Sequence, residues 1–286
     1  MPATTAVIVA HNSAAVLPQC LAAIGGEVPV IVVDNGSADD SAALAAAAGA
    51  RVLRPGRNLG FGPGANLGFA EVTTEFGILL NADAVPAPGM FSGLEVAARR
   101  FPEAGLLAPA IRGEDGALQF GRRLPFEPGR RDAPVAMPEG DCCAPYVGGS
   151  DMFFPMRVFR ALGGFNPDIF LYFEDDDICL RVRAAGHSLV HVTSARMDHA
   201  GGKSSAPSPR LDWCKAWHQG WSRLHLEAKH RGRGAAWARL ARDWPELAVK
   251  AALRRGDARH AKWSGRAARM LAWARGVRAT DAALDP

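Results

Sequence analysis

Four adjacent carboxylates stand out in this chain, in the run Phe173-Glu174-Asp175-Asp176-Asp177. Like charges a few ångströms apart repel one another, so such a group needs a cation, a proton or solvent to offset the repulsion. A further acidic position lies in Asn81-Ala82-Asp83, which ends an apolar run over residues 76–80. Carboxylates paired in this way are typical ligands of a divalent metal ion, and they indicate a metal site at the edge of a sheet.

Each of these features also has an ordinary structural interpretation. Acidic residues are common at helix N-termini, and this run precedes a predicted helix over residues 178–185 that Gly186 closes. Asn81 and Asp83 suit a turn that follows a strand. A lone histidine such as His199 is more often structural than a metal ligand. The metal interpretation therefore depends on the elements that bring these residues together.

Strands and helices are predicted to alternate through the first part of the chain. The apolar β-rich runs cover residues 6–10, 29–33 and 51–53, and helical spacing covers residues 14–24 and 39–48. This alternation predicts an α/β fold with a parallel sheet covered by helices. Right-handed crossovers bring the carboxyl ends of the three strands to one edge, where open sheets of this class bind ligands.

Polar residues gather at that predicted edge. They are His11-Asn12-Ser13, Asp34-Asn35-Gly36-Ser37, residues 58–62 and Asn81-Ala82-Asp83. Carboxylates and amides suit a base and a ribose, and glycines allow the backbone to approach a ligand closely, so the set has the composition of a nucleotide pocket. Neither a G-x-G-x-x-G motif after the first strand nor a Walker A sequence occurs. Dinucleotide binding and P-loop phosphoryl transfer are therefore disfavoured.

Composition sets further limits on the class of protein. Hydrophobic residues make up 48% of the 286, which is enough for a substantial core. An apolar stretch of about 18 residues is absent, and no basic segment precedes the first apolar run, so we expect a cytoplasmic protein. The five cysteines form no C-x-x-C pair, which fits a reduced compartment and excludes a zinc ribbon or a disulfide scaffold.

Charge divides the chain into two regions. Residues 1–202 carry 15 basic and 22 acidic side chains, whereas residues 203–286 carry 18 basic and 7 acidic side chains. All seven tryptophans also lie in residues 203–286. Helical spacing of Trp213, Trp217 and Trp221 predicts an amphipathic helix that packs on the preceding domain. Beyond it, basic residues alternate with Trp237, Leu240, Trp244 and Leu247, a pattern that suits an anionic membrane surface. Because no nucleic-acid module accompanies the basic residues, nucleic acid is not an expected partner.

In chain order, the motifs of this sequence resemble those of family 2 glycosyltransferases, in particular the bacterial rhamnosyltransferase-like branch. The matching segments are residues 7–12, 33–37, 58–62, 80–83, 148–149, 164–166 and 173–181, followed by His199. Each motif is weak alone, but the ordered set across about residues 5–205 is specific. The resemblance implies a GT-A fold, with a Rossmann-like, mostly parallel sheet flanked by helices and a mainly helical C-terminal extension.

The resemblance also implies a division into domains and an activity. Residues 1–205 would form the catalytic domain, with the donor half at about 1–110 and the acceptor half at about 111–205, and residues 206–286 the basic, Trp-rich extension. The implied reaction is an inverting, single-displacement sugar transfer that uses Mg²⁺ or Mn²⁺. The expected donor is a nucleotide-sugar, with dTDP-rhamnose or a UDP-sugar favoured. The expected acceptor is a glycan or a polyprenyl-linked saccharide in the synthesis of a cell-envelope or extracellular polysaccharide.

Site residues carry over from the family position by position. The donor-binding positions are Ala10, His11, Asn12, Asp34, Asn35, Asn58, Gly60, Asn66, Asn81, Ala82 and Asp83. Asp83 and His199 match the metal positions of the family. Asn81 stands in place of the first carboxylate of a D-x-D motif, and His11 stands where many relatives have tyrosine.

The acidic run matches the catalytic motif of the family, and Asp175 falls at the position of the base. Glu174 and Asp176 are alternative bases or orienting groups. The acceptor-binding positions are Gly148, Gly149, Glu174 and Arg181. Arg181 has a second interpretation, an ion pair with a nearby carboxylate. We expect a location in the cytoplasm or at the cytoplasmic face of the inner membrane, and a homodimer is one open alternative for the oligomeric state.

Two other functions compete with glycosyl transfer. A nucleotidyltransferase with a similar α/β half would carry an N-terminal Gly-rich phosphate loop with Arg or Lys, and the sequence has none. A catalytically silent nucleotide- or glycan-binding protein is the other alternative. The presence of Asp83, Asp175 and His199 together argues against it.

Overall fold

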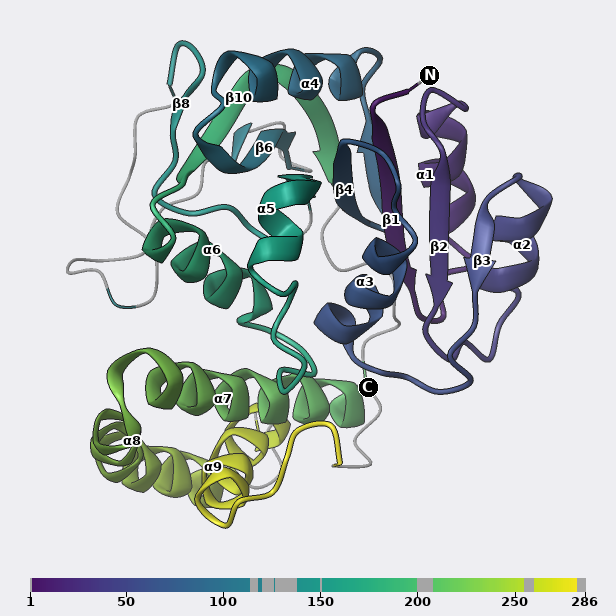
Figure 1. Cartoon of the computed structure of the whole chain (residues 1–286). Helices are drawn as coiled ribbons and strands as arrows, with labels where there is room; N and C mark the ends of the chain where they lie inside the picture. Colours follow the sequence, from purple (N-terminus) through teal and green to yellow (C-terminus); the bar gives the residue numbers. More distant parts are fainter. Residues whose placement is uncertain are drawn as a thin grey trace. The chain divides into compact units, whose positions relative to one another are not determined.

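The computed structural model describes residues 2–113, 118–119, 126, 138–149, 151–199, 208–254 and 260–281. The chain forms two compact units (Figure 1). The first unit consists of Met1–Asn58, Gly64–Phe165 and Asp175–Ser205. The second consists of Leu59–Pro63, Asn166–Glu174 and Ala206–Pro286. The C-terminal region thus shares its unit with two short segments from the earlier part of the chain.

A mixed sheet forms the centre of the first unit. Its strands follow the order β3-β2-β1-β4-β9-β6-β10-β5. Their bounds are β1 (Thr4–Ala10), β2 (Val30–Asp34), β3 (Arg51–Leu53), β4 (Phe76–Asn81), β5 (Ala84–Pro86), β6 (Ala104–Arg112), β9 (Asp151–Pro155) and β10 (Ser188–His199), with β7 (Leu118–Gln119) on β6 and β8 (Cys142–Cys143) on β10. Strands β1, β2, β3 and β4 pair with one another in parallel, which agrees with the predicted parallel sheet. Strand β9 is antiparallel to β4 and links it to the parallel pair β6 and β10.

Helices cover both faces of this sheet. On one face, α1 (Leu17–Ile24), α2 (Ser41–Ala47) and α4 (Met90–Arg100) pack over Ile8 and Leu80. On the other, Phe69 of α3 (Phe61–Ala70) packs with Phe154 of β9 and Phe159 of α5 (Met156–Ala161). Gly68 of α3 allows the close approach, because a Cβ there would lie 2.4 Å from Cγ1 of Val7. The strands are buried from both sides, as is usual in α/β sheets.

The acidic run lies inside a helix and not before one. We predicted a helix from residue 178, but α6 runs from Glu174 to Ala184 and takes the run into its first turn. Carboxylates near a helix N-terminus are favoured by the backbone dipole. Within α6, Asp177 also meets Arg181 four residues on, at 2.8 Å. The carboxylates therefore form part of the helix instead of the loop that leads to it.

The C-terminal part of the second unit is helical, as predicted, with α7 (Pro209–Arg231), α8 (Arg233–Leu253) and α9 (His260–Ala274). Ser208 caps α7 by accepting a hydrogen bond from the amide of Leu211 at 3.1 Å. Inside the group of helices, Glu227 is 2% exposed and pairs with Arg231 at 2.6 Å and Arg239 at 2.8 Å. Among the described residues, no helix has the length and apolar character needed to cross a membrane.

Most of the predicted aromatic stripe is enclosed by other side chains. Trp217 and Trp221 pack with Phe170, and Leu240, Trp244 and Leu247 pack against a cluster centred on Leu224, Ala236 and Met270. Trp237 stays 43% exposed. Both parts of the stripe are thus largely enclosed within the second unit, and packing of the helix on the preceding domain stays a prediction.

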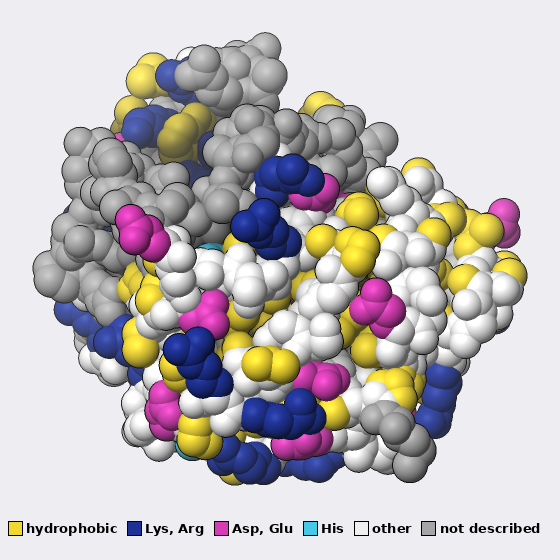
Figure 2. Space-filling model, turned by 90° about the horizontal axis from the view of Figure 1, so that it is seen from above, with side chains coloured by type: hydrophobic (Ala, Val, Ile, Leu, Met, Phe, Trp, Pro, Cys, Tyr) yellow, Lys and Arg dark blue, Asp and Glu magenta, His cyan; other side chains and the backbone are white. Residues whose placement is uncertain are grey.

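Charged side chains of both signs are mixed on the surface that Figure 2 shows, where Lys and Arg lie close to Asp and Glu. Ion pairs of this kind include Arg99 with Glu95 at 3.7 Å and Arg51 with Glu71 at 2.6 Å. Such exposed pairs contribute little to stability, about 0–1 kcal/mol each. The fold is therefore stabilised mainly by its buried apolar core.

Candidate active site

The carboxyl ends of the parallel strands meet at one edge of the sheet, as the sequence predicts. Ala10 of β1 lies in register with Asp34 of β2, and Val9 lies in register with Asn81 of β4. The segments that follow these three strands therefore start side by side. This arrangement brings three of the four predicted donor segments to the same edge.

Hydrogen bonds join the predicted donor segments to one another. Nδ1 of His11 lies 3.0 Å from the backbone oxygen of Asn35, and the side-chain amide of Asn35 donates to Oδ1 of Asn58 at 2.9 Å. Asn12 accepts from the amide of Ala38 at 2.8 Å. Gly36 has φ +80, and a Cβ there would lie 2.8 Å from the nitrogen of Asn58. Glycine at this position allows the segment after β2 to contact Asn58.

Two predicted donor positions have structural partners in the chain. The side-chain amide of Asn66 donates to the backbone oxygen of Phe165 and accepts from its amide, both at 2.8 Å. In the second unit, Gly60 has φ +92, and a Cβ there would lie 2.4 Å from the backbone oxygen of Phe170. These contacts fix the two loops. Donor binding by Asn66 and Gly60 stays a prediction.

The predicted metal positions come from adjacent strands. Asp83 is 9% exposed and directly precedes β5, whose first residue, Ala84, lies in register with His199 of β10. The backbone of His199 is therefore placed opposite the residue that follows Asp83. The side chain of His199 lies outside the described part of the chain. Strand pairing thus brings two distant segments together at the predicted metal position.

A buried carboxylate that we did not predict lies at the same edge. Asp151 of β9 is fully buried and lies in register with Leu80 of β4, next to Asn81. The thiol of Cys20 donates to the backbone oxygen of Asn81 at 3.7 Å. Burial, Asp83 and Asp151 together raise the pKa of Cys20 to about 12, so the thiol stays neutral. The one available signal in the sequence was an acidic residue directly before the apolar run of residues 152–154.

The four carboxylates of the acidic run differ in exposure. Glu174, Asp176 and Asp177 are 6%, 4% and 0% exposed, whereas Asp175 is partly exposed. Arg181 pairs with Asp177, and its other nitrogens donate to the backbone oxygens of Leu162 at 2.8 Å and Gly164 at 2.7 Å. The ion pair is the second of our two interpretations of Arg181. Asp175 is the member of the run that solvent or a substrate reaches most readily.

Hydrogen bonds hold the carboxylate of Asp175 in place. Its Oδ2 accepts from the hydroxyl of Tyr146 and from the amide of Gly149 at 3.1 Å, and its Oδ1 accepts from the amide of Asp176 at 2.9 Å. A Cβ at Gly149 would lie 3.4 Å from Cβ of Asp175, so the glycine packs against this side chain. The segment that holds Gly148 and Gly149 therefore supports Asp175, and acceptor binding by these glycines stays a prediction.

The residues just before the acidic run have an uncommon backbone conformation. Tyr172 and Phe173 have φ of 65° and 69°, which is strained for residues other than glycine. Within the second unit, α7 supports this segment. Ser222 donates to the backbone oxygen of Leu171 at 2.9 Å, and the guanidinium of Arg223 lies 5.5 Å from the centre of the Phe173 ring. The C-terminal helices thus stabilise the chain where it enters the catalytic motif.

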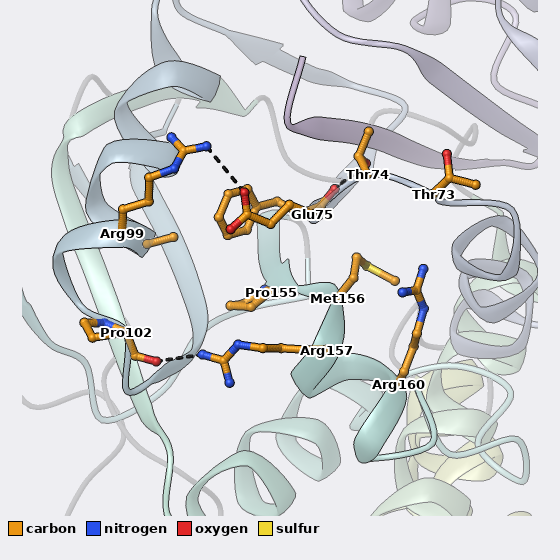
Figure 3. A pocket seen from close by; sticks show the side chains of 11 residues that line it. Thr73, Thr74, Glu75, Arg99, Pro102, Pro155, Met156, Arg157 and Arg160 are labelled. Carbon is orange, nitrogen blue, oxygen red and sulfur yellow. Dashed lines mark hydrogen bonds and ion pairs between the residues drawn. The ribbon is translucent and has the colours of Figure 1, made fainter. Parts of the chain in front are cut away.

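A pocket of about 540 Å³ lies at the other end of β4 (Figure 3). It is lined by residues around Phe76, the first residue of β4, and Pro155, the last residue of β9. Arg157 donates to the backbone oxygen of Pro102 at 2.7 Å, and Arg160 to that of Val72 at 2.6 Å. Because ligands of open α/β sheets bind at the carboxyl edge, this pocket is separate from the candidate active site.

The exposures predict that two aspartates of the run respond differently to substitution. Asp177→Asn removes one partner of a buried ion pair and should lower the free energy of unfolding by about 3 kcal/mol. Asp175→Asn keeps an oxygen acceptor at a partly exposed position and should change the free energy of unfolding by less than about 1 kcal/mol. Urea denaturation measures both. Equal losses of stability would contradict the division into a structural and a reacting carboxylate.

Comparison with known proteins agrees with this geometry. The family model described as Glycosyl transferase family 2 matches residues 5–154, which is just over half of the chain. A curated relative from Mycobacterium tuberculosis, N-acetylglucosaminyl-diphospho-decaprenol L-rhamnosyltransferase, is 29% identical over 280 residues, covering 82% of this chain and 88% of the relative.

Solved glycosyltransferases show the same fold. The mannosyltransferase PcManGT from Pyrobaculum calidifontis, in complex with GDP-Man and Mn²⁺, superposes with a TM-score of 0.57 at 17% identity, covering 96% of this chain and 87% of that one. GalNAc-T7 with UDP, GalNAc and Mn²⁺ superposes with a TM-score of 0.56 at 17% identity, covering 79% of this chain and about half (49%) of its own length. The predicted GT-A fold is confirmed, and the chain belongs to glycosyl transferase family 2 and is a rhamnosyltransferase-like glycosyltransferase.

Proposed function

We propose that this enzyme transfers a sugar from a nucleotide-sugar to a polyprenyl-linked saccharide, with inversion at the anomeric carbon and with a divalent metal ion. The observation that carries this proposal is the position of Asp175, a partly exposed carboxylate held by Gly149 and Tyr146 in an otherwise buried acidic run. The curated relative is named for transfer of L-rhamnose to a diphospho-decaprenol saccharide, which supports this class of acceptor.

The donor nucleotide would bind at the carboxyl edge of β1, β2 and β4. His11, Asn35 and Asn58 are connected there by hydrogen bonds and present ring, amide and backbone groups. Asp34 is 9% exposed and lies at the end of β2, where a carboxylate suits the hydroxyls of a ribose. The identities of the donor's sugar and base are also proposals, and we favour dTDP-rhamnose or a UDP-sugar.

We propose that a divalent metal ion binds at Asp83. Magnesium and similar ions bind through one or two carboxylates together with substrate phosphates, so few protein ligands are needed. Asp83 would supply a carboxylate, and the family motif assigns His199 as a further ligand. The backbone of His199 pairs with Ala84, the residue after Asp83. Asn81 offers an amide oxygen in place of a second charge. A bound Mg²⁺ or Mn²⁺ would stabilise the negative charge that develops on the departing nucleoside diphosphate.

Asp175 would act as the general base. As the hydroxyl oxygen of the acceptor forms its bond to the anomeric carbon, its proton passes to the Asp175 carboxylate, and the bond to the nucleoside diphosphate breaks with its electron pair. Attack from the face opposite the leaving group inverts the configuration. Glu174 and Asp176 are nearly buried, which favours an orienting role for both.

We also propose that the C-terminal helices contact an anionic membrane, where a polyprenyl-linked acceptor resides. The second unit carries exposed apolar side chains at Trp237, Val249 and Leu253, and residues 203–286 carry 18 basic and 7 acidic side chains. Basic and aromatic side chains in combination favour anionic lipid surfaces. This proposal is independent of the catalytic one.

Two substitutions separate metal binding from chemistry. Asp175→Asn should lower transfer by at least about a hundredfold and spare donor binding, because it removes the base and leaves the carboxyl edge intact. Asp83→Ala should weaken Mn²⁺-dependent binding of the donor, measured by calorimetry with dTDP-, UDP- and GDP-sugars with and without Mn²⁺. Loss of donor binding in Asp175→Asn but not in Asp83→Ala would show that the two roles are reversed.

Vesicle flotation tests the membrane proposal. The full-length protein should float with vesicles that contain anionic phosphatidylglycerol and stay soluble with phosphatidylcholine alone. The variant Trp237→Ala with Leu253→Ser should float less, because it removes exposed apolar area from the second unit. Equal recovery in the soluble fraction with both kinds of vesicle would overturn the proposal.

A further inference from the structure

We propose that Tyr146 is a positioning residue for the catalytic carboxylate, a role that rests on the proposed function of Asp175 as the base. The hydroxyl of Tyr146 donates a hydrogen bond to Oδ2 of Asp175 across 29 residues of sequence. The amide of Gly149 donates to the same oxygen at 3.1 Å. Tyr146 belongs to the segment before β9, and Asp175 lies in the first turn of α6, so this contact joins two separate parts of the first unit.

The direction of the Tyr146 hydrogen bond follows from the charges around the phenol. Burial, and then the charges of Asp175 and Asp176, raise the pKa of Tyr146 well above its usual range. The hydroxyl therefore keeps its proton throughout the working range of an enzyme. Since an ionised carboxylate only accepts hydrogen bonds, Tyr146 donates and Asp175 accepts.

The same contacts identify which oxygen of Asp175 receives the proton from the acceptor. Oδ2 accepts two hydrogen bonds, from Tyr146 and Gly149, which occupy both of its lone-pair positions. Oδ1 accepts one, from the amide of Asp176 at 2.9 Å. Oδ1 thus keeps a lone pair for the hydroxyl proton of the acceptor. Tyr146 would orient the carboxylate so that this lone pair points toward the substrate.

The Tyr146 hydrogen bond also offsets the repulsion inside the acidic run. Glu174, Asp176 and Asp177 are neighbours of Asp175 on α6, and negative charges nearby favour the protonated form of a carboxylate. Asp177 is partly compensated by Arg181 at 2.8 Å. A hydrogen bond donated to the ionised form has the opposite effect. Tyr146 would therefore help to hold the Asp175 carboxylate in place among these like charges.

One further titratable side chain faces this group. Cys179 lies one turn along α6, and its charge would act on Tyr146. Burial raises the pKa of the Cys179 thiol well above its usual range, and this effect outweighs the opposing hydrogen bond to the backbone oxygen of Val147. The thiol is therefore neutral and adds no charge beside Tyr146 and Asp175.

Tyr146→Phe tests the proposal, because phenylalanine keeps the ring and removes only the hydroxyl. We expect kcat to fall by about tenfold because the carboxylate is less well oriented. Donor affinity, measured by calorimetry with Mn²⁺ present, should stay unchanged and also reports that the variant is folded.

Two further variants make the outcomes distinguishable. Glu71→Gln changes an exposed side chain that pairs with Arg51 and should leave both kcat and donor affinity unchanged. Asp175→Asn tests the proposed function itself. If Asp175→Asn retains transfer, the assignment of the base fails. If Asp175→Asn is inactive while Tyr146→Phe keeps the wild-type kcat, the role of Tyr146 alone is overturned.

Discussion

The fixed carboxylate of Asp175 is the constraint around which the catalytic motif is arranged. Three other carboxylates surround it in the same helical turn, and each of them is nearly or fully buried. Burying so many like charges is unfavourable unless each has partners. Arg181 compensates Asp177, and Gly149 and Tyr146 hold Asp175 from outside the helix. The result is one accessible carboxylate in a rigid and strongly acidic setting.

This constraint explains several features around the catalytic carboxylate. Arg181 donates to the backbone oxygens of Leu162 and Gly164, which connects the turn after α5 to α6. The left-handed conformation of Tyr172 and Phe173 is unfavourable by itself and persists only because surrounding contacts determine it. Ser222 and Arg223 of α7 supply such contacts. The basic C-terminal region therefore has a structural role in addition to any contact with a membrane.

Much of the fold was predictable because its signals are local. Alternating apolar runs and helical spacing predicted β1, β2, β3 and the helices between them, and strand ends rich in Asn and Asp indicated the ligand-binding edge. The order of the motifs along the chain was enough to indicate the family, because each motif is a short contiguous segment. The start of α6 was predicted at residue 178 instead of 174, because an acidic run suits both a helix cap and a first turn.

The parts of the site that the sequence did not predict depend on contacts between distant segments. Tyr146 and Asp175 are 29 residues apart, and nothing in the local sequence of Tyr146 indicates a hydrogen bond to the catalytic motif. Asp151 reaches the edge near Asn81 through antiparallel pairing of β9 with β4, a register that composition does not encode. Likewise, the sequence pattern suited Trp237 and Trp244 to a membrane surface, whereas Trp244 packs against a buried cluster and Trp237 stays 43% exposed. Burial of such side chains is decided by the tertiary fold.

The anomeric configuration of the product tests the central claim most directly. The enzyme would be incubated with an activated nucleotide-sugar, Mn²⁺ and a polyprenyl-linked saccharide, and the product examined by proton NMR before it equilibrates. A single displacement with Asp175 as base predicts that the new glycosidic bond has the configuration opposite to that of the donor. A product with retained configuration would contradict the account, because it would require two displacements or attack from the face of the leaving group.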